Sequence, residues 1–440
     1  MEVLSRIAQD VRTIGLDRTP AEVRVQGALC ILDTVGCMLA GSRTEEAKLM
    51  LDCEADVADA CTIVGSAERR DVGTAIRVNG YFGDVLELND LIGGHASIAN
   101  VAASIALAEA RGVSGARLLE AVIRGIEVTT RVYSAVYPTL KRYTETGMVP
   151  VGLPSTIGAA AAAAHLLDLN AIQTANALAI AGGLAGWCPA EVIFGQGGTM
   201  KPLLFGAQPG AVGVTAAQYA SKGMTGPLSL MESPTGYFAT VARSGELAPP
   251  GWALLEPRRK LHACCGYLHA PVDGVGRLRQ RLGAKLQHAH LRVRVAPYVA
   301  DVVSKTNPPT SPNDARFHLQ YCLALAVCGA DVILPEHSIE LQAQLSRPEV
   351  QDAMTRIEVV QDVSIAHYHR CLVSCEGAEE TVSAPRGAPN EPLSDEEVMA
   401  KFMVLAQPVI GAQAAREFAG RTQAIADVTD VRSWIALTAR

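Results

Sequence analysis

The chain has 440 residues, of which 49% are hydrophobic and 19% are charged. This length suits two domains or one large domain, and the composition excludes a disordered chain, a collagen-like repeat and a charged coiled coil. The net charge of −7 and the lack of a long basic run argue against a nucleic-acid groove and a polybasic membrane patch. An acidic ligand therefore requires a local cationic pocket.

Residues 1–15 carry charged side chains between apolar residues at helical spacing, which predicts a first helix and not a signal peptide. No stretch of the sequence reaches the roughly 20 apolar residues that cross a bilayer. The eleven cysteines are scattered over the chain without a disulfide framework, which favours reduced thiols. We therefore expect a cytoplasmic protein that is not embedded in a membrane.

Up to about residue 250, apolar residues recur every three to four positions and Ala and Leu dominate, which predicts a bundle of helices. Ser97 stands before the helical stretch 98–111 and Asn170 before 171–186, and Gly112 and Gly223 follow two of the predicted helices, as helix caps do. The predicted helices of this part cover 21–41, 96–111, 115–136, 158–168, 170–186 and 208–222.

The pattern changes after Gly251, where short segments with alternating or β-branched residues predict strands at 290–298, 356–364 and 380–384. Further helical patterns cover 271–284, 316–329, 347–355, 394–419 and 430–439. We expect a mainly α protein with an α/β part. Its large all-helical domain comprises residues 1–264 and 396–440, and its smaller α/β domain comprises residues 265–395.

The most polar cluster in an otherwise apolar stretch runs from Glu87 through Asn89 and Asp90 to His95. His95 stands in a Gly-rich loop before a helix, where the helix dipole disfavours the charged imidazole. It can therefore act as a neutral hydrogen-bond partner or as a proton carrier. An ordinary solvated loop is an equally good interpretation of the pattern.

Lys201 lies between a glycine pair and Pro202, in a chain with few lysines. A lysine that is desolvated by apolar neighbours loses proton affinity, so it can serve as a base or as a point charge for a carboxylate. The glycines before it do not form a phosphate loop, since no strand precedes them and no Gly-Lys-Ser/Thr occurs. A nucleotide site is therefore disfavoured.

A third cluster contains Lys260, His262, Cys264, Cys265 and His269. Zinc is disfavoured there because adjacent cysteines cannot easily both bind one ion and no second pair stands at the usual spacing. His367, His369, Cys371 and Cys375 form a similar group, for which packing is the favoured interpretation. The Gly-x-Ser-x-Gly motif is absent, which excludes hydrolases of that type.

Taken together, these motifs resemble the MmgE/PrpD family, whose members include dehydratases of 2-methylcitrate, decarboxylases of cis-aconitate and epimerases of iminodisuccinate. The resemblance spans nearly the whole chain and implies a large helical domain built from both chain ends, a smaller α/β domain, a homodimer, and an active site between the domains without a cofactor. Its specific parts are Asn79-Gly80, Glu87 to Asp90, His95-Ala-Ser, Gly158, Met200-Lys201-Pro202, Gly223 to Pro227, Lys260 to His269, and Asp314 to Phe317.

The resemblance implies catalytic roles for His95, Lys201 and His269, which match the family's functional positions. Three positions depart from it: Glu87 replaces an aspartate, Leu91 stands where the family has a threonine, and the position of a second catalytic histidine falls near Val149. The last two changes remove a hydroxyl and an imidazole that would assist the departure of water or carbon dioxide.

These losses favour a reaction that moves protons without a leaving group. We expect an isomerase, a cofactor-independent epimerase that removes a proton alpha to a carboxylate of a polycarboxylic substrate such as iminodisuccinate. The alternatives are a lyase, either a 2-methylcitrate-type dehydratase or a cis-aconitate-type decarboxylase, and a silent helical dimer that only binds polycarboxylates. The expected catalytic residues are Lys201, His95, Tyr143 and His269, and the expected substrate-binding residues are Glu87, Asp90, Arg142, Lys260 and Lys305, with Arg259 as a further candidate.

Overall fold

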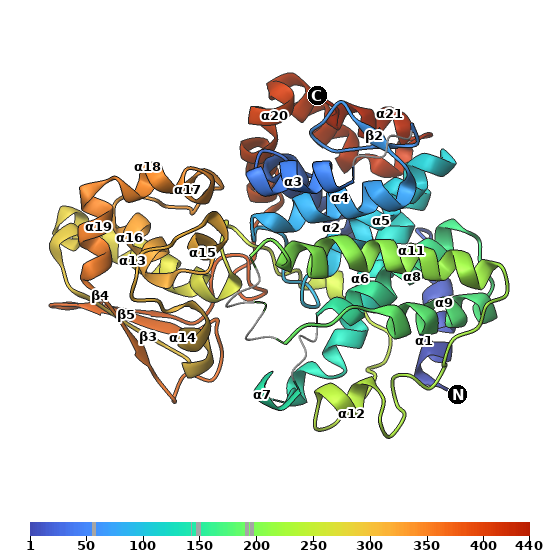
Figure 1. The fold of residues 1–440 in the computed structure, drawn as a ribbon, viewed down its shortest axis with the longest axis horizontal. Helices are drawn as coiled ribbons and strands as arrows, with labels where there is room; N and C mark the ends of the chain where they lie inside the picture. Colours follow the sequence, from blue (N-terminus) through green and yellow to red (C-terminus); the bar gives the residue numbers. More distant parts are fainter. Residues whose placement is uncertain (55–58, 142, 147–150, 190–192, 194–197) are drawn as a thin grey trace. The chain divides into compact units, whose positions relative to one another are not determined.

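The computed structural model describes residues 1–54, 59–141, 143–146, 151–189, 193 and 198–440 (Figure 1). These residues form two compact units. The helical unit comprises Met1–Val85, Asn89–Pro257 and Ser394–Arg440, and the sheet unit comprises Leu86–Leu88 and Arg258–Leu393. The expected fold class is confirmed, because the first unit is built of helices and the second adds a small mixed sheet.

The units divide the chain at slightly different positions from those that the sequence pattern suggests. The change of pattern predicts boundaries at 264/265 and 395/396, whereas the units change at 257/258 and 393/394. Residues 86–88 also belong to the sheet unit, although they follow a helix of the other unit directly. A buried contact between Lys260 and Glu87, described below, accounts for this assignment.

The helical unit contains the predicted helices and several further ones. Its helices are α1 (Val3–Arg12), α2 (Ala21–Gly41), α3 (Glu45–Cys53), α4 (Val72–Val85), α5 (Ala96–Arg111), α6 (Gly115–Ser134), α7 (Tyr143–Thr146), α8 (Gly152–Leu166), α9 (Ala171–Leu184), α11 (Gln208–Ser221), α12 (Tyr237–Val241), α20 (Asp395–Gln423) and α21 (Arg432–Ile435). Its short helical turns are η1 (Tyr137–Thr139), η2 (Leu203–Ala207, a π-helix), η3 (Ala253–Leu255), η6 (Ile425–Asp427) and η7 (Ala436–Thr438).

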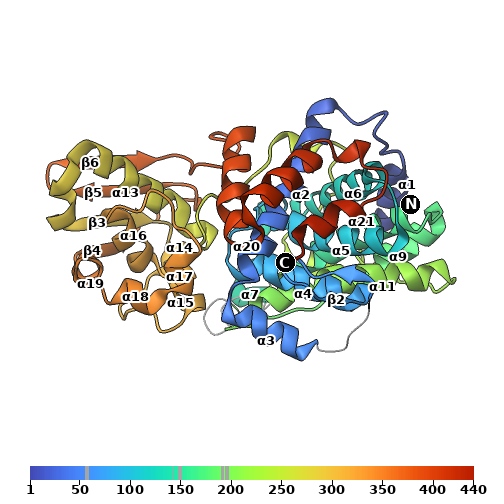
Figure 2. The same cartoon turned by 90° about the horizontal axis from the view of Figure 1, so that it is seen from above.

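The centre of the helical unit is α8, which packs against α5, α6, α9 and α11 (Figure 1). In the same unit, α20 lies beside α2 (Figure 2). Its sequence is a run of buried alanines from Ala159 to Ala164, so neighbouring helices can approach closely. At Gly158, a Cβ atom would lie 1.9 Å from Thr129 Oγ1, and at Gly213 it would lie 2.6 Å from Ala159 Cβ. Small residues at these positions are therefore required for the packing.

Two helices, α2 and α20, are long and apolar enough to cross a membrane by length and composition alone. In α2 the apolar window is 83% buried inside the unit, where the helix packs against α20 and α4. A buried ion pair of 2.7 Å joins Asp33 Oδ1 of α2 to Lys401 Nζ of α20. The burial pattern of α2 is that of a core helix.

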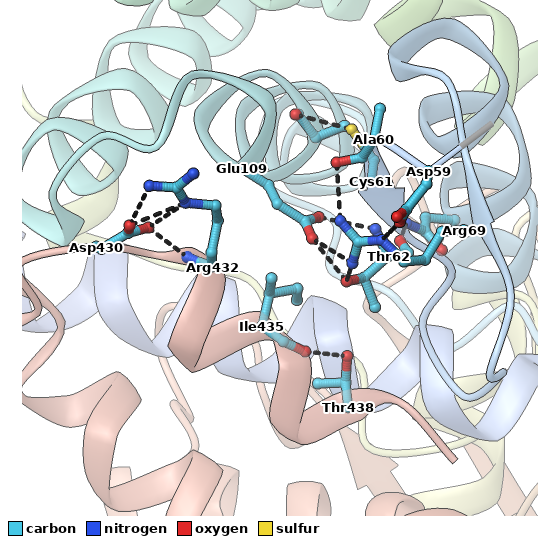
Figure 3. Close-up of polar contacts among 12 residues, drawn as sticks. Asp59, Ala60, Cys61, Thr62, Arg69, Glu109, Asp430, Arg432, Ile435 and Thr438 are labelled. Carbon is cyan, nitrogen blue, oxygen red and sulfur yellow. Dashed lines mark hydrogen bonds and ion pairs between the residues drawn. The ribbon is translucent and has the colours of Figure 1, made fainter.

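The C-terminal segment completes the helical unit next to a small hairpin of β1 (Cys61–Thr62) and β2 (Arg69–Arg70) (Figure 3). Glu109 of α5 is 2% exposed and accepts hydrogen bonds from Thr62 N (2.8 Å), Thr62 Oγ1 (2.7 Å) and Arg69 Nη1 (3.0 Å). The chain end joins this region through the hydrogen bond from Gly65 N to Thr438 O, at 2.9 Å. The β1–β2 hairpin and the C-terminal segment therefore pack together, although they are far apart in the sequence.

The sheet unit contains a four-stranded sheet in the order β4-β3-β5-β6, in which β3 and β4 are parallel and the other pairs are antiparallel. Its strands are β3 (Leu291–Val295), β4 (Ile357–Gln361), β5 (Cys371–Cys375) and β6 (Ala378–Val382). Its helices are α13 (His269–Leu282), α14 (Pro297–Val303), α15 (Pro312–Arg316), α16 (Leu319–Val327), α17 (Glu336–Ile339), α18 (Leu341–Leu345) and α19 (Pro348–Thr355), with short turns η4 (Gly266–Leu268) and η5 (Gly283–His288).

The core of the sheet unit lies between the sheet and helices α13 and α16 (Figure 1). Along β3, Leu291, Val293 and Val295 are buried and the residues between them are not, which is the alternation expected of a strand covered on one face. Helix α13 contacts β5 and β6, and Gly274 permits this contact because a Cβ atom there would lie 2.8 Å from Val373 Cγ2.

Candidate active site

A buried ion pair between Lys201 and Asp84 forms the centre of the candidate site in the helical unit. Lys201 Nζ lies 2.9 Å from Oδ1 and 2.8 Å from Oδ2 of Asp84. Lys201 is 2% exposed and Asp84 is 0% exposed. An ammonium and a carboxylate can be buried together at such a site because each compensates the lost hydration of the other.

The approach of α4 to the segment after residue 198 brings these two charges together. Gly80 of α4 faces Gly206 of η2, and a Cβ atom at Gly80 would lie 2.3 Å from Gly206 O. At the next residue of α4, the Tyr81 hydroxyl donates to Thr199 O at 3.1 Å. These contacts fix the backbone on either side of Lys201, so its side chain reaches Asp84 in a defined direction.

Asn89 connects this ion pair to His95. Its Nδ2 donates to Asp84 Oδ1 at 2.6 Å, and its Oδ1 lies 2.7 Å from His95 Nδ1. Because the amide nitrogen is used on the carboxylate, the amide oxygen faces the imidazole and must accept from Nδ1–H. The lone pair of a neutral His95 is therefore on Nε2, which is the atom that can bind or release a proton.

The loop that carries His95 adopts an unusual backbone. His95 has φ +81° and Glu87 has φ +54°, and these are two of the three non-glycine residues with positive φ in the described chain. Gly94 has φ +69° and packs against Tyr133, so that a side chain would clash there. Strained backbone of this kind persists where the surrounding structure enforces it, and such positions are concentrated at functional sites.

Asp90 anchors the same loop to the first turn of α5. It is 3% exposed and accepts a hydrogen bond from the Ser97 hydroxyl. Ser97 is therefore inside the helix and not at its cap, contrary to our prediction, and His95 occupies the N-cap position. Asn170 is confirmed as a cap and forms a capping box with Gln173 at the start of α9.

Phe205 packs against both catalytic candidates of this site, His95 and Lys201. Its ring is stacked on His95 with centroids 5.9 Å apart, and Lys201 Nζ lies 4.8 Å from its centroid. The aromatic face and the Asp84 carboxylate both stabilise the charged form of Lys201. This arrangement favours Lys201 as a fixed positive charge, whereas the sequence-based argument for a base requires a neutral amine.

In the sheet unit, Lys260 holds the strained residue Glu87. Lys260 is fully buried, and its Nζ donates to Glu87 O at 2.9 Å and to Glu87 Oε2 at 2.8 Å. Both residues were expected to bind substrate, and the structure pairs them with each other. These two hydrogen bonds fix the backbone at the beginning of the acidic segment 87–90.

The two histidines of the third cluster differ in their contacts. His262 accepts from Ile333 N at 3.1 Å and donates from Nε2 to Asp273 Oδ1 at 3.1 Å, so both ring nitrogens serve the local structure. His269 is 2% exposed, and its Nε2 donates to Cys264 O at 3.3 Å. The two rings pack edge to face at 4.9 Å. His269 lies in the sheet unit, and its catalytic role stays a prediction.

The remaining candidates are less informative. Lys305 Nζ donates a hydrogen bond to Asp314. Burial alone would raise the pKa of the Asp314 carboxyl, but its hydrogen bonds, including the one from Lys305, lower this pKa below its usual value. Arg259 is buried and its backbone N–H donates to Gly387 O at 2.9 Å. Arg142 lies outside the described residues, and for Tyr143 the structure describes only its place at the start of α7.

The described part of the chain contains no group of three or more His, Cys, Asp and Glu residues arranged to hold a metal ion. Burial raises the pKa of the Cys264 thiol, and burial lowers the pKa of His369 to about 3. Cys371 begins the central strand β5, where its side chain is buried. These groups behave as packing residues of the sheet unit.

Asp84 and Phe205 are not among the site residues that the sequence pattern predicts, and Asn89 appears there only as part of a motif. A signal for Asp84 was present, because it is the only charged residue between Arg77 and Glu87. A carboxylate in an apolar helix requires a cationic or hydrogen-bonding partner, so its position could have directed attention to a buried lysine. No comparable signal marks Phe205.

Comparisons with known proteins cover nearly the whole chain. Residues 5–249 match the MmgE/PrpD N-terminal domain, and residues 262–425 match the MmgE/PrpD C-terminal domain. The chain is 26% identical to the cis-aconitate decarboxylase of Aspergillus terreus over an alignment of 479 positions, gaps included, which covers 99% of this chain and 95% of the relative. It is 25% identical to the human cis-aconitate decarboxylase over 410 residues, which cover 86% of this chain and 82% of the relative.

A third relative, the cis-aconitate decarboxylase-like protein oryM of Aspergillus oryzae, is 26% identical over 463 residues, with 95% of this chain and 93% of the relative covered. All three relatives are named as decarboxylases or decarboxylase-like proteins, and decarboxylases are lyases. The prediction of an epimerase, and with it of an isomerase, is therefore wrong. It rested on the absent groups at Leu91 and Val149, whereas the cationic groups that are present also suit the loss of carbon dioxide.

Proposed function

The chain belongs to the MmgE/PrpD family, and from this premise we propose that it is a lyase that releases carbon dioxide from a small unsaturated tricarboxylate such as cis-aconitate. The observation that carries the proposal is the buried chain of contacts from Lys201 through Asp84 and Asn89 to His95. It holds a fixed positive charge and a proton carrier in one site, and the named relatives favour decarboxylation over dehydration.

The chemistry of this reaction requires two things from the protein. When the bond to the departing carboxylate breaks, its electron pair moves into a new double bond, and negative charge develops at the far end of the unsaturated system. A positive group must stabilise that charge and the carboxylates that stay, and an acid must deliver a proton to carbon. No oxidant, reductant or leaving group other than carbon dioxide is involved.

His95 suits the role of the acid. Its Nδ1–H is held by Asn89, so protonation and deprotonation take place at Nε2. The residue is half-buried, which leaves it accessible to a ligand, whereas Lys201 and Asp84 are buried. In the proposed step, the imidazolium transfers its Nε2 proton to the carbanion carbon and becomes neutral.

Lys201 suits the role of the positive group. Its ammonium carries three hydrogens, and two of them point to the oxygens of Asp84. The ion pair fixes the direction of the ammonium and preserves its charge, so no reorganisation is needed when charge develops on the substrate. Asp84 and Asn89 act through Lys201 and His95, and we assign them positioning roles.

The resemblance to the family extends the proposal to features that belong to the whole protein. We expect a homodimer in the cytoplasm that works without a cofactor and binds neither nucleic acid nor membranes. The net charge of −7 supports the absence of a nucleic-acid partner. Sedimentation of the purified protein would test the dimer directly.

The function is tested by incubating the purified chain with cis-aconitate and, separately, with 2-methylcitrate. The proposal predicts carbon dioxide release from cis-aconitate, together with a change in ultraviolet absorbance as the double bond moves. A dehydratase would instead produce a new double bond from 2-methylcitrate without carbon dioxide. If neither substrate reacts and no carbon dioxide appears from related tricarboxylates, the proposed activity is incorrect.

A further inference from the structure

A cationic cavity lies in the helical unit, apart from the residues of the candidate active site. Its volume is about 310 Å³, the lower end of the range that small-molecule sites occupy. Its walls come from α1, α6, α8 and the segment that leads into α9. Lining residues include Arg12, Arg124, His165, Asp168, Asn170 and Thr174, and Ala161 and Ala164 add an apolar surface.

Arg124 is the most informative residue of this cavity. It is 9% exposed, and its Nη2 donates to Ile14 O. Its Nε is buried and has no hydrogen-bond partner in the described structure. A buried guanidinium N–H without an acceptor is costly, and a cavity beside it is where an acceptor would bind.

Arg12 adds a second positive charge at the cavity. Its Nη1 donates to Leu169 O at 2.5 Å, so its partner is again a neutral carbonyl. Among the described residues, neither Arg12 nor Arg124 has a carboxylate within ion-pair distance. Both guanidinium groups are therefore outside any described ion pair, and Arg124 is compensated only by the longer-range charge of Glu120.

The acidic residues around the cavity are engaged elsewhere. Asp168 Oδ1 pairs with Arg117 Nη2 at 2.8 Å. Glu120 Oε2 lies 3.0 Å from His165 Nε2, and Glu120 Oε1 accepts from Leu16 N at 3.0 Å. Burial lowers the pKa of Arg124, Glu120 raises it, and the nearby charges of Arg117 and Arg12 lower it further. A bound anion would relieve this repulsion.

We infer that this cavity is a second ligand site, which binds a small organic or inorganic anion through Arg12 and Arg124. Carboxylate and phosphate groups each present a pair of oxygens that a guanidinium group can bind with two parallel hydrogen bonds. The N-terminus of α9, a helix of 14 residues that begins after Asn170, adds a favourable partial charge. The apolar surface of Ala161 and Ala164 accommodates a short carbon skeleton.

The test measures binding of inorganic phosphate and of succinate, in separate titrations, by calorimetry on the full chain. We expect at least one of the two anions to bind and its affinity to fall about 10-fold in Arg12→Gln, because a charge-assisted contact is lost. Arg124→Met should have an effect at least as large. Arg12 is exposed, so its variant tests the site even if the Arg124 variant does not fold.

Two controls make the outcome specific. Arg6→Gln removes the same charge from another exposed position of α1 that does not line the cavity, and it should leave binding unchanged. Lys201→Met should also retain binding, which separates this site from the candidate active site. The inference is overturned if neither anion binds, if Arg12→Gln binds as well as the unchanged chain, or if Arg6→Gln weakens binding equally.

Discussion

At the scale of single residues, the account depends on the pairing of buried charges. Asp84 holds Lys201, and Glu87 holds Lys260, in each case within 3 Å. A buried lysine in a sequence suggests a group that gives up its proton, but a carboxylate partner reverses this expectation because it stabilises the ammonium. The sequence could indicate that Lys201 is functional, yet its partner decides which form of the amine the site contains.

Replacement of Lys201 tests its proposed role. Lys201→Met should lower kcat/KM for carbon dioxide release by about 10²-fold or more, because a preorganised positive charge is lost at the developing anion. The exposed Lys222→Met is the matched control and should retain full activity. Because this variant leaves the buried Asp84 without its ammonium partner, its folded state is checked by circular dichroism, which should match that of the unchanged chain.

His95→Gln complements this test because His95 is only half-buried and its loss leaves the Lys201 ion pair intact. It should remove most of the activity and also the ionisation at Nε2 from the pH profile of kcat. Activity of both variants close to that of the unchanged chain would show that the site is elsewhere.

Glu127 gives the stability of the protein a specific dependence on pH. It is 8% exposed and accepts from Ala253 N (2.8 Å) and Leu254 N (3.1 Å), and burial raises its pKa from 4.5 to about 7. The folded state therefore binds this proton more tightly than the unfolded state, and its contribution to stability is lost as the pH rises from about 4.5 through 7.

The change expected from this one group is on the order of 3 kcal/mol. Denaturant unfolding of Glu127→Gln between pH 4.5 and 8 should show a weaker loss of stability with rising pH than the unchanged chain. Glu256→Gln, at an exposed position nearby, should leave the slope unchanged. An equal slope in all three proteins would contradict the role of Glu127.

At the scale of secondary-structure elements, the long helices followed from the sequence. The predicted segments 21–41 and 96–111 coincide with α2 and α5, and Gly112 adopts the left-handed conformation that a helix C-terminus requires. These segments have a clear apolar period, and their length is that of ordinary globular helices. The segment 290–298 likewise contains β3, because the alternation of its residues reflects burial on one face only.

Several elements were not predicted, and α4 and β5 illustrate why. Helix α4 contains Gly73, Gly80 and Gly83, which weaken a helical pattern, and Gly80 is needed for the close contact with η2. Strand β5 starts in the group of His367 to Cys375, where potential metal ligands obscured the strand pattern. In both cases tertiary packing determined the residue types, and one sequence does not contain that information.

The contact between α4 and η2 can be tested with a single methyl group. Gly80→Ala should destabilise the protein by about 1–3 kcal/mol, because the new Cβ would meet a backbone oxygen that cannot move away easily. It should also lower kcat, since the contact determines how Lys201 meets Asp84. Urea unfolding and carbon dioxide release measure the two effects.

Gly420→Ala provides the matched control, because this glycine lies in α20 and a Cβ atom there would meet nothing within 4 Å. This variant should be unchanged or about 0.5–1 kcal/mol more stable, with full activity. If Gly80→Ala behaved in the same way, the proposed close contact would not determine the geometry of the site.

At the scale of the whole molecule, the chain closes on itself in the helical unit. Helix α20 returns after the sheet unit and packs along α2, and the Lys401 to Asp33 ion pair joins the two helices in the core. Sequence patterns indicated that helix resumes near residue 394, but its packing partner depends on contacts between residues more than 300 positions apart in the chain.

The candidate site was accessible to sequence analysis only in part. Lys201 and His95 were singled out by local motifs, and the structure connects them through Asp84 and Asn89 in one network. The reaction class was not accessible in the same way, because the missing hydroxyl at Leu91 and the missing imidazole near Val149 favour an epimerase over a lyase. For the reaction class, the groups that are present at the site are therefore more informative than the groups that are missing.

The most direct test of the central claim is the reaction of cis-aconitate in deuterium oxide, with products analysed by mass spectrometry. A lyase that protonates a carbanion should yield carbon dioxide and a dicarboxylate that carries one deuterium bound to carbon, and Lys201→Met should form little of it. Recovery of a tricarboxylate with all its carbon atoms, with or without exchanged hydrogen, would contradict the proposed reaction.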